Sequence, residues 1–94
     1  MNIPSFSRYE ADALEAGFDE VLVRVWAPNA AVDIHQHAFG VEALVVAGDM
    51  WLTSGDVTRH LRAGDAFALE PFAPHSERYG PTGATYWAAR KNAR

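Results

Sequence analysis

The chain has 94 residues, of which 49% are hydrophobic and 21% are charged, with a formal net charge of -4. It contains no cysteine, which excludes disulfides and thiolate metal ligands. Its basic residues form no stripe, so we expect no nucleic-acid partner, and no apolar run or leader pattern indicates a membrane or secreted protein. We therefore expect one cytoplasmic domain over residues 1–94, with its core at about 20–90.

The first predicted element is a helix at 7–17, where Ser7 and Glu10 have the spacing of a capping box and Gly17 suits the C-terminal end. After it the periodicity changes to that of strands. The β-branched residues of 20–28 predict the first strand. Further strands are expected at 31–37, 41–48, 50–54, 57–62, 65–69, 75–80 and 84–91. About eight short strands after one helix indicate an all-β barrel or jelly roll.

Two histidines stand two residues apart in the segment "AVDIHQH". Alternation along a strand places His35 and His37, together with Asp33, on one face. Glu42 follows on the next predicted strand, on a face that also carries Leu44 and that we expect to point inward. A buried carboxylate carries a large free-energy cost unless it is paired or bound to a metal. The pattern therefore indicates that His35, His37 and Glu42 converge on a cation.

A third histidine follows the proline-rich turn "PFAPH". Pro71 and Pro74 restrict the backbone, and we expect them to hold Phe72 and Ala73 extended and to present His75 at a rigid strand entrance. Three imidazoles and one carboxylate would leave one or two positions open on a five- or six-coordinate metal. Such ligands suit Fe, Mn, Ni, Zn or Cu, and the residue types do not choose among these ions.

Both segments resemble the motifs of the cupin superfamily. The first motif contains H-x-H, a glutamate and a glycine, and here it is similar to "HQHAFGVEALVVAG", with four residues before the glutamate. The second motif is represented by Gly64, Pro71 and His75, with Ala73 near the usual glycine and Tyr79 at the usual asparagine. The resemblance covers about residues 20–90 and is strongest to small single-domain bacterial cupins. It implies an RmlC-like jelly roll that holds one divalent metal through His35, His37, Glu42 and His75.

Two residues beyond the ligands are candidates for a catalytic role. Glu77 and Tyr79 alternate with His75 along the same predicted strand. Glu77 could accept a proton, and Tyr79 could donate a hydrogen bond to a metal-bound ligand. Packing or surface roles are the alternative for both residues.

Three other polar residues have two interpretations each. Asp33 could accept a hydrogen bond from an imidazole, or it could be a surface residue near a turn. Arg24 interrupts an apolar strand and could bind an anionic substrate, or it could face solvent at an edge. His60 is expected at the surface of a hairpin, away from the other histidines.

Two functions follow from the resemblance. The first is a metal-dependent enzyme that acts on a small molecule by dioxygenase-, isomerase- or lyase-type chemistry, and the second is a non-catalytic module that binds or senses a small molecule. We favour the enzyme because four protein ligands leave an open coordination position. A homodimer is also expected, since so short a chain buries little core and similar cupins pair through sheet edges.

Overall fold

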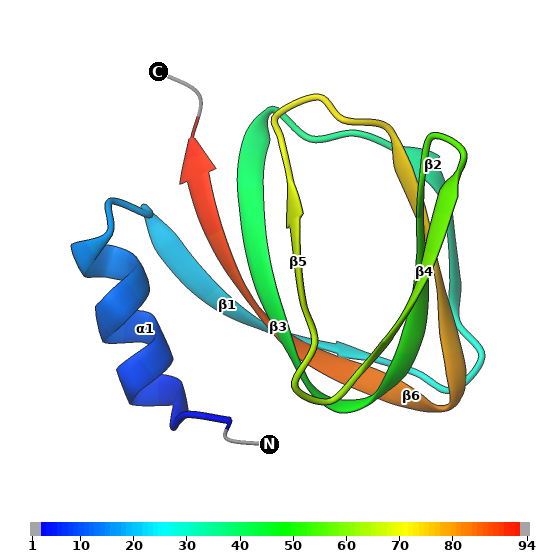
Figure 1. Ribbon diagram of the computed structural model, residues 1–94, viewed down its shortest axis with the longest axis horizontal. Helices are drawn as coiled ribbons and strands as arrows, with labels where there is room; N and C mark the ends of the chain where they lie inside the picture. Colours follow the sequence, from blue (N-terminus) through cyan, green and yellow to red (C-terminus); the bar gives the residue numbers. More distant parts are fainter. Residues whose placement is uncertain (1–2, 93–94) are drawn as a thin grey trace.

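The computed structural model describes residues 3–92, which form one helix and a curled antiparallel sheet (Figure 1). The strand order is β1-β6-β3-β4, with β2 also paired to β6 and β5 to β3. These residues confirm the expected all-β class with a short N-terminal helix. The elements are α1 (Phe6–Glu15), β1 (Glu20–Trp26), β2 (Ala31–His35), β3 (Phe39–Ser54), β4 (Val57–Arg62), β5 (Ala66–Leu69) and β6 (His75–Asn92).

Two long strands, β3 and β6, each combine two of the strands expected from the sequence. They pair with each other antiparallel, with register shifts between Val45 and Ala47 and again between Gly48 and Met50. Gly48 and Gly83 both have a left-handed backbone, and a Cβ on Gly48 would collide with the carbonyl oxygen of Gly83. These glycines therefore bend two continuous strands around the barrel, where the sequence pattern suggested strand ends.

The helix begins earlier than the capping-box pattern predicted. Ser5 is the N-cap, and its hydroxyl accepts a hydrogen bond from the Arg8 backbone N–H at 3.2 Å. The capping box of Ser7 and Glu10 is therefore wrong, because the chain enters the helix before Ser7. The expected C-terminal end is confirmed, since Gly17 follows the last turn with a φ of 99°.

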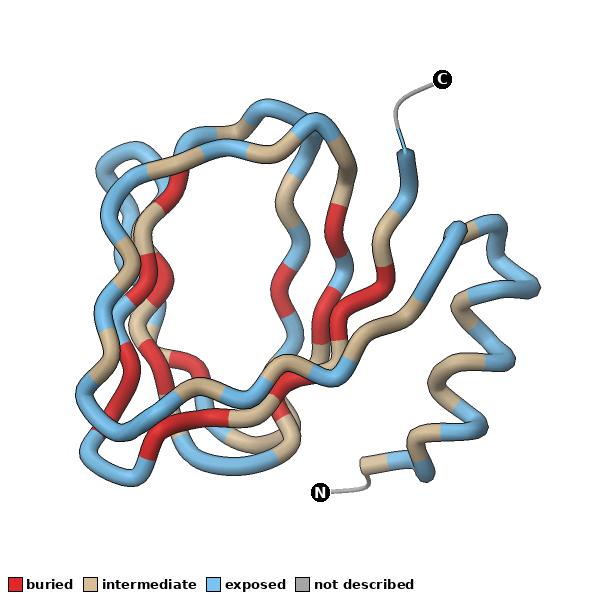
Figure 2. Tube along the Cα trace, turned by 180° about the vertical axis from the view of Figure 1, so that it is seen from behind, coloured by how far each residue is buried: buried red, intermediate tan, exposed pale blue. Residues whose placement is uncertain are grey.

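The helix covers part of the outer face of the sheet and contributes no buried residue (Figure 2). Phe6 and Tyr9 contact Trp87 of β6, with ring centroids 5.3 and 5.6 Å apart. The core lies inside the barrel, where buried residues alternate along the strands (Figure 2). The largest fully buried side chains are Tyr79, Met50, Leu61 and Val45. No helix within residues 3–92 has the length and apolarity needed to cross a membrane.

Candidate metal centre

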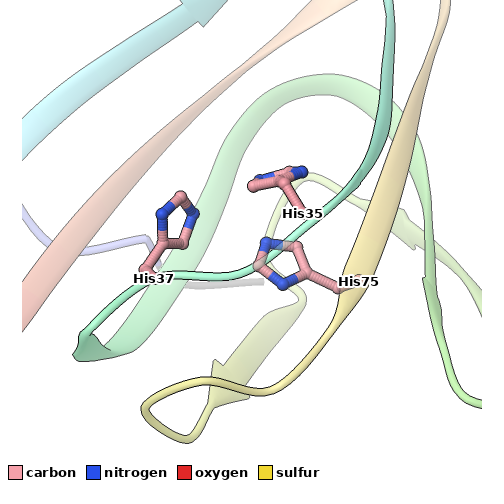
Figure 3. Close-up of side chains that lie close together, drawn as sticks. All are labelled: His35, His37 and His75. Carbon is pink, nitrogen blue, oxygen red and sulfur yellow. The ribbon is translucent and has the colours of Figure 1, made fainter.

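Three histidines converge inside the barrel (Figure 3). His35 on β2 lies directly opposite His75, the first residue of β6, and His37 follows just after the end of β2. Each residue offers a ring nitrogen, and these atoms all lie within 4.8 Å of one another. His75 is buried, and the other two are half-buried. The structure therefore brings together all three histidines that the sequence pattern had grouped.

An irregularity in β2 turns His35 toward the interior. The register between β2 and β6 shifts between Val32 and His35, and both of these side chains line the same cavity. Asp33 is exposed, and Ile34 is 74% exposed. The strict alternation that placed Asp33 on the histidine face is therefore wrong, because a bulge puts two residues between successive inward positions.

Backbone carbonyls fix the tautomers of two of the histidines. Nδ1 of His35 lies 2.8 Å from the carbonyl oxygen of Asp33, and Nδ1 of His75 lies 2.9 Å from that of Ala73. A carbonyl can only accept, so Nδ1 carries the proton and Nε2 presents its lone pair. This is the arrangement that orients imidazole ligands on a metal ion. The chemistry of this donor set therefore fits a divalent transition metal.

His37 is neutral more readily than an ordinary histidine. Burial lowers the pKa of its imidazole, and the neighbouring His35 and His75 lower it further. Its ring is stacked on Phe39, with the centroids 4.7 Å apart. Because neutral imidazole is the form that binds metals, these surroundings favour a ligand role at neutral pH.

The turn before His75 differs from its predicted form. Phe72 adopts a left-handed backbone, with a φ of 64°, inside a tight turn closed by a hydrogen bond from the Ala73 N–H to the Glu70 carbonyl. The expected extended conformation of Phe72 is wrong, because a proline restricts the residue before it, and Phe72 follows Pro71. The Phe72 N–H donates to the His37 carbonyl at 2.6 Å, so this turn joins the two chain segments that carry the histidines.

Glu42 lies outside the histidine group. It is exposed on the outer face of β3, while Val41 and Ala43 on either side of it are buried. The expected inward position of Glu42 is therefore wrong. The side-chain period of a strand is two, so one residue of offset moves a side chain to the opposite face. The neighbouring residue Val41 lines the cavity, where the carboxylate of Glu42 was expected.

Glu77 supplies a carboxylate to the interior instead. Its side chain is buried, and Oε2 lies 3.4 Å from Nε2 of His35 and 3.8 Å from Nε2 of His75. Oε1 accepts a hydrogen bond of 2.6 Å from the Tyr79 hydroxyl and one of 3.4 Å from the Tyr86 hydroxyl. Burial raises the pKa of both phenols, and the Glu77 carboxylate raises both further. Both tyrosines therefore remain donors that hold one oxygen and leave the other facing the histidines.

The histidines and Glu77 line a cavity of about 90 Å³. Its walls also include apolar side chains, among them Val41, Phe67 and Leu69. Tyr79 does not line this cavity; it lies behind Glu77, with its ring stacked on Trp26 at a centroid distance of 4.9 Å. Its position suits a residue that orients Glu77 more than one that touches a bound ligand.

The fourth histidine, His60, lies outside this group, as the sequence suggested, but it is half-buried with partners of its own instead of at the surface. Nε2 of His60 lies 2.6 Å from an Asp49 carboxylate oxygen, and Nδ1 lies 3.1 Å from the Arg62 guanidinium. The imidazole is stacked on Trp51, with ring centroids 4.3 Å apart. Neither nitrogen is directed at the cavity.

No protein-family model matches the chain, but comparisons with known proteins find one similar curated protein and several similar solved structures. The chain is 40% identical to H2HPP isomerase of Bacillus subtilis over 63 residues, which are 66% of this chain and 27% of that protein. The chain thus spans about a quarter of the length of this curated relative.

Solved structures share the fold. An RmlC-like cupin from Shewanella frigidimarina NCIMB 400 is 25% identical, with a TM-score of 0.70 over 80% of this chain and 67% of that chain. The DMSP lyase DddQ from Ruegeria pomeroyi DSS-3 is 19% identical, with a TM-score of 0.72 over 78% of this chain and 38% of that chain. At this identity the likeness to the lyase concerns the fold.

Proposed function

Because this chain has the cupin fold, we propose that it is a metal-dependent enzyme that transfers a proton on a small molecule in an isomerase- or lyase-type reaction. In this proposal His35, His37 and His75 bind one divalent metal, and Glu77 is the proton acceptor. The observation that carries the proposal is the carboxylate of Glu77, with one oxygen held by two phenols and the other 3.4 Å from Nε2 of His35.

The proposed ligand set consists of three imidazoles from the inner face of the barrel. Such nitrogen ligation suits Fe, Mn, Ni, Zn or Cu, and leaves coordination positions open for water or substrate. When bound, the metal would act as a Lewis acid toward a carbonyl oxygen of the substrate. Glu42 has no part in this set, because it lies on the opposite face of β3.

The chemistry of the chain's own residues then follows from Glu77. Its Oε2 takes a proton from a carbon next to the substrate carbonyl, and the C–H electron pair moves toward that carbonyl. In an isomerisation the same oxygen returns the proton to another carbon, and in an elimination the electron pair expels a leaving group from the neighbouring carbon. Tyr79 and Tyr86 keep Oε1 hydrogen-bonded throughout, so the carboxylate retains its orientation.

Two further observations support proton transfer over oxygen chemistry. Proton transfer requires a base beside the bound substrate, as Glu77 is beside the histidines, whereas dioxygenase chemistry does not. In addition, the curated relative is an isomerase by name, and one solved neighbour is a lyase. Dioxygenase chemistry and a non-catalytic binding module are the alternatives.

The test uses the full chain loaded with Zn²⁺, Mn²⁺ or Fe²⁺ and a panel of small 2-oxo acids in D₂O. Exchange of the hydrogens beside the carbonyl is followed by NMR, and metal content is measured by mass spectrometry. We expect about one metal per chain and an exchange rate that falls about 10²- to 10⁴-fold in Glu77→Gln. Glu42→Gln is the matched control, and we expect it to behave as the wild type.

Other outcomes would contradict the proposal. Exchange in Glu77→Gln as fast as in the wild type would remove Glu77 from the mechanism. Oxygen consumption by the Fe²⁺ form without exchange would favour a dioxygenase. Thermal shifts on ligand addition, with neither exchange nor oxygen consumption, would favour the binding module.

A homodimer stays a prediction. Val23 and Val25 on the outer face of β1 are 51% and 74% exposed, which leaves apolar surface for a second copy. Light scattering coupled to size-exclusion chromatography tests this expectation, and a monomer at micromolar concentration would contradict it.

A further inference from the structure

We infer that the cavity selects a small molecule bearing a carboxylate, which Arg24 and Arg90 bind while the rest of the molecule faces the histidines. This inference names the substrate class of the proposed enzyme and rests on that function. Arg24 on β1 and Arg90 on β6 both line the cavity that contains the three histidines. They are its only cationic residues within the described part of the chain, apart from the histidines.

Aromatic rings hold both guanidinium groups at the cavity wall. The Arg24 guanidinium carbon lies 5.2 Å from the centroid of the Trp26 ring, and that of Arg90 lies 4.4 Å from the centroid of Phe39. Trp26 and Phe39 line the same cavity. Contact with an aromatic face restricts the long arginine side chain. The N–H groups of the guanidinium remain free to donate within the plane of that group.

The positive charges of both arginines lie at the wall of the cavity, since both side chains line it. Burial and Glu77 raise the pKa of Tyr86, which lines the same cavity, and the charge of Arg24 opposes that rise. Two cations at one cavity wall attract an anion.

Carboxylates of the chain itself occupy the two arginines only weakly, so both guanidinium groups can bind a ligand. Among residues 3–92, no carboxylate lies within ion-pair distance of Arg24. Within the described part of the chain, Arg90 pairs only with Glu20, at 3.4 Å, and the Glu20 side chain is 52% exposed. An ion pair at such an exposed position is weak and can open for a ligand. Glu77 has one carboxylate oxygen engaged by two phenol donors, and no ion pair joins it to either arginine within residues 3–92.

The chemistry of the ligand follows from these donors. A guanidinium is a planar fork that matches the two oxygens of a carboxylate. The cavity of about 90 Å³ favours a small ligand, and the proposed proton transfer requires a carbonyl. A short oxo acid has both groups, with the carboxylate toward the arginines and the carbonyl toward the histidines.

The test measures binding by calorimetry on the Zn²⁺-loaded full chain, with pyruvate as the probe and methyl pyruvate as its uncharged counterpart. We expect Arg24→Gln and Arg90→Gln each to weaken pyruvate binding about 10- to 100-fold, and Arg24→Lys to recover part of the loss. The matched control is Arg78→Gln. Arg78 also lies over a tryptophan, 4.9 Å from the centroid of Trp51, but it does not line this cavity.

Three results would overturn the inference. Wild-type pyruvate affinity in both glutamine variants would show that the arginines do not hold the carboxylate. Methyl pyruvate binding as tightly as pyruvate would show that charge is not recognised. Inorganic phosphate that displaces pyruvate with equal affinity, in an arginine-dependent way, would replace the carboxylate with a phosphate group.

The same experiment separates this inference from the proposed function. A Zn²⁺ titration of the wild type comes first. Failure to bind Zn²⁺, or any of the other divalent metals, contradicts the proposed function, whereas arginine-dependent pyruvate binding to the metal-free chain would still support the carboxylate site. Tight metal binding with arginine variants that bind pyruvate normally would contradict only the inference.

Discussion

The histidines of the cavity and His60 on β4 differ in what their ring nitrogens contact. His60 has both nitrogens engaged, by Asp49 at 2.6 Å and Arg62 at 3.1 Å, and one face of its ring covered by Trp51. His35 and His75 each use Nδ1 on a backbone carbonyl and direct Nε2 at the group that includes Glu77. Both regions combine imidazole with carboxylate, yet only the interior one presents several lone pairs to a shared space.

This difference separates a structural histidine from a candidate ligand. The contacts of His60 are complete within the sheet, so its removal should affect the fold. His35 and His75 each have Nδ1 hydrogen-bonded to a backbone carbonyl, which fixes the direction of Nε2.

Replacing a histidine of the cavity should remove metal binding, and replacing His60 should not. We expect His75→Ala to weaken Zn²⁺ affinity by more than about 100-fold, since even loss of a supporting hydrogen bond lowers metal affinity 10- to 100-fold. His60→Ala should keep the wild-type affinity. Competition with a chelator of known affinity measures both. Equal losses in the two variants would contradict the contrast.

Tyr79→Phe should affect Glu77 without affecting the metal. The variant loses the 2.6 Å hydrogen bond to Oε1 but keeps the aromatic ring that stacks on Trp26. We expect kcat for proton exchange to fall about tenfold, with KM and Zn²⁺ affinity unchanged, and stability to fall by about 1 kcal/mol. Tyr86→Phe is the control, and its effect should be smaller, because that hydroxyl lies 3.4 Å from the same oxygen. A proportional change in metal affinity would indicate a purely structural role for Tyr79.

His60→Ala should destabilise the metal-free fold. The variant breaks the hydrogen bond to Asp49 and uncovers one face of Trp51. Because the His60 side chain is 29% exposed, the loss should be limited to about 1–2 kcal/mol. Urea denaturation measures it, and His37→Ala, also half-buried, is the control with a smaller expected loss. A His60→Ala variant as stable as the wild type would show that these contacts contribute nothing.

The sequence predicted the type of fold and the three histidines, because both depend on local patterns. Short β-rich segments gave the strands, and the spacing of His35 and His37 with the turn before His75 gave the cluster. It did not predict the continuity of β3 and β6, because a glycine that bends a strand has the same local signal as one that ends it.

The carboxylate was misplaced for a different reason. The run "VEALVVAG" is apolar at nearly every position, so neither face is marked as the inner one, and Glu42 could be assigned to either. The parity of the strand decides it: Val41, Ala43 and Val45 are buried, and Glu42 lies between them on the outside. Glu77 shares the parity of His75 on β6 and is the buried carboxylate. Arg24 and Arg90 line one cavity because β1 pairs with β6. This pairing joins distant parts of the chain, so no local sequence pattern could predict it.

The smallest expected effect is the pH dependence of stability in the metal-free chain. The pKa of His37 is lowered in the folded state, whereas an imidazole in the unfolded chain titrates near about 6.5. Below that pH the unfolded state binds the proton more readily, so the contribution of His37 to stability is present above about pH 6.5 and is lost as the pH falls through the lowered pKa. His37→Gln cannot take up this proton, so its Tm should fall less between pH 7.5 and pH 5, by a few degrees at most. Thermal denaturation of both proteins in a chelating buffer measures the difference. Because every other titrating group is common to the two proteins, identical pH profiles would show that the interior surroundings of His37 do not disfavour its charge.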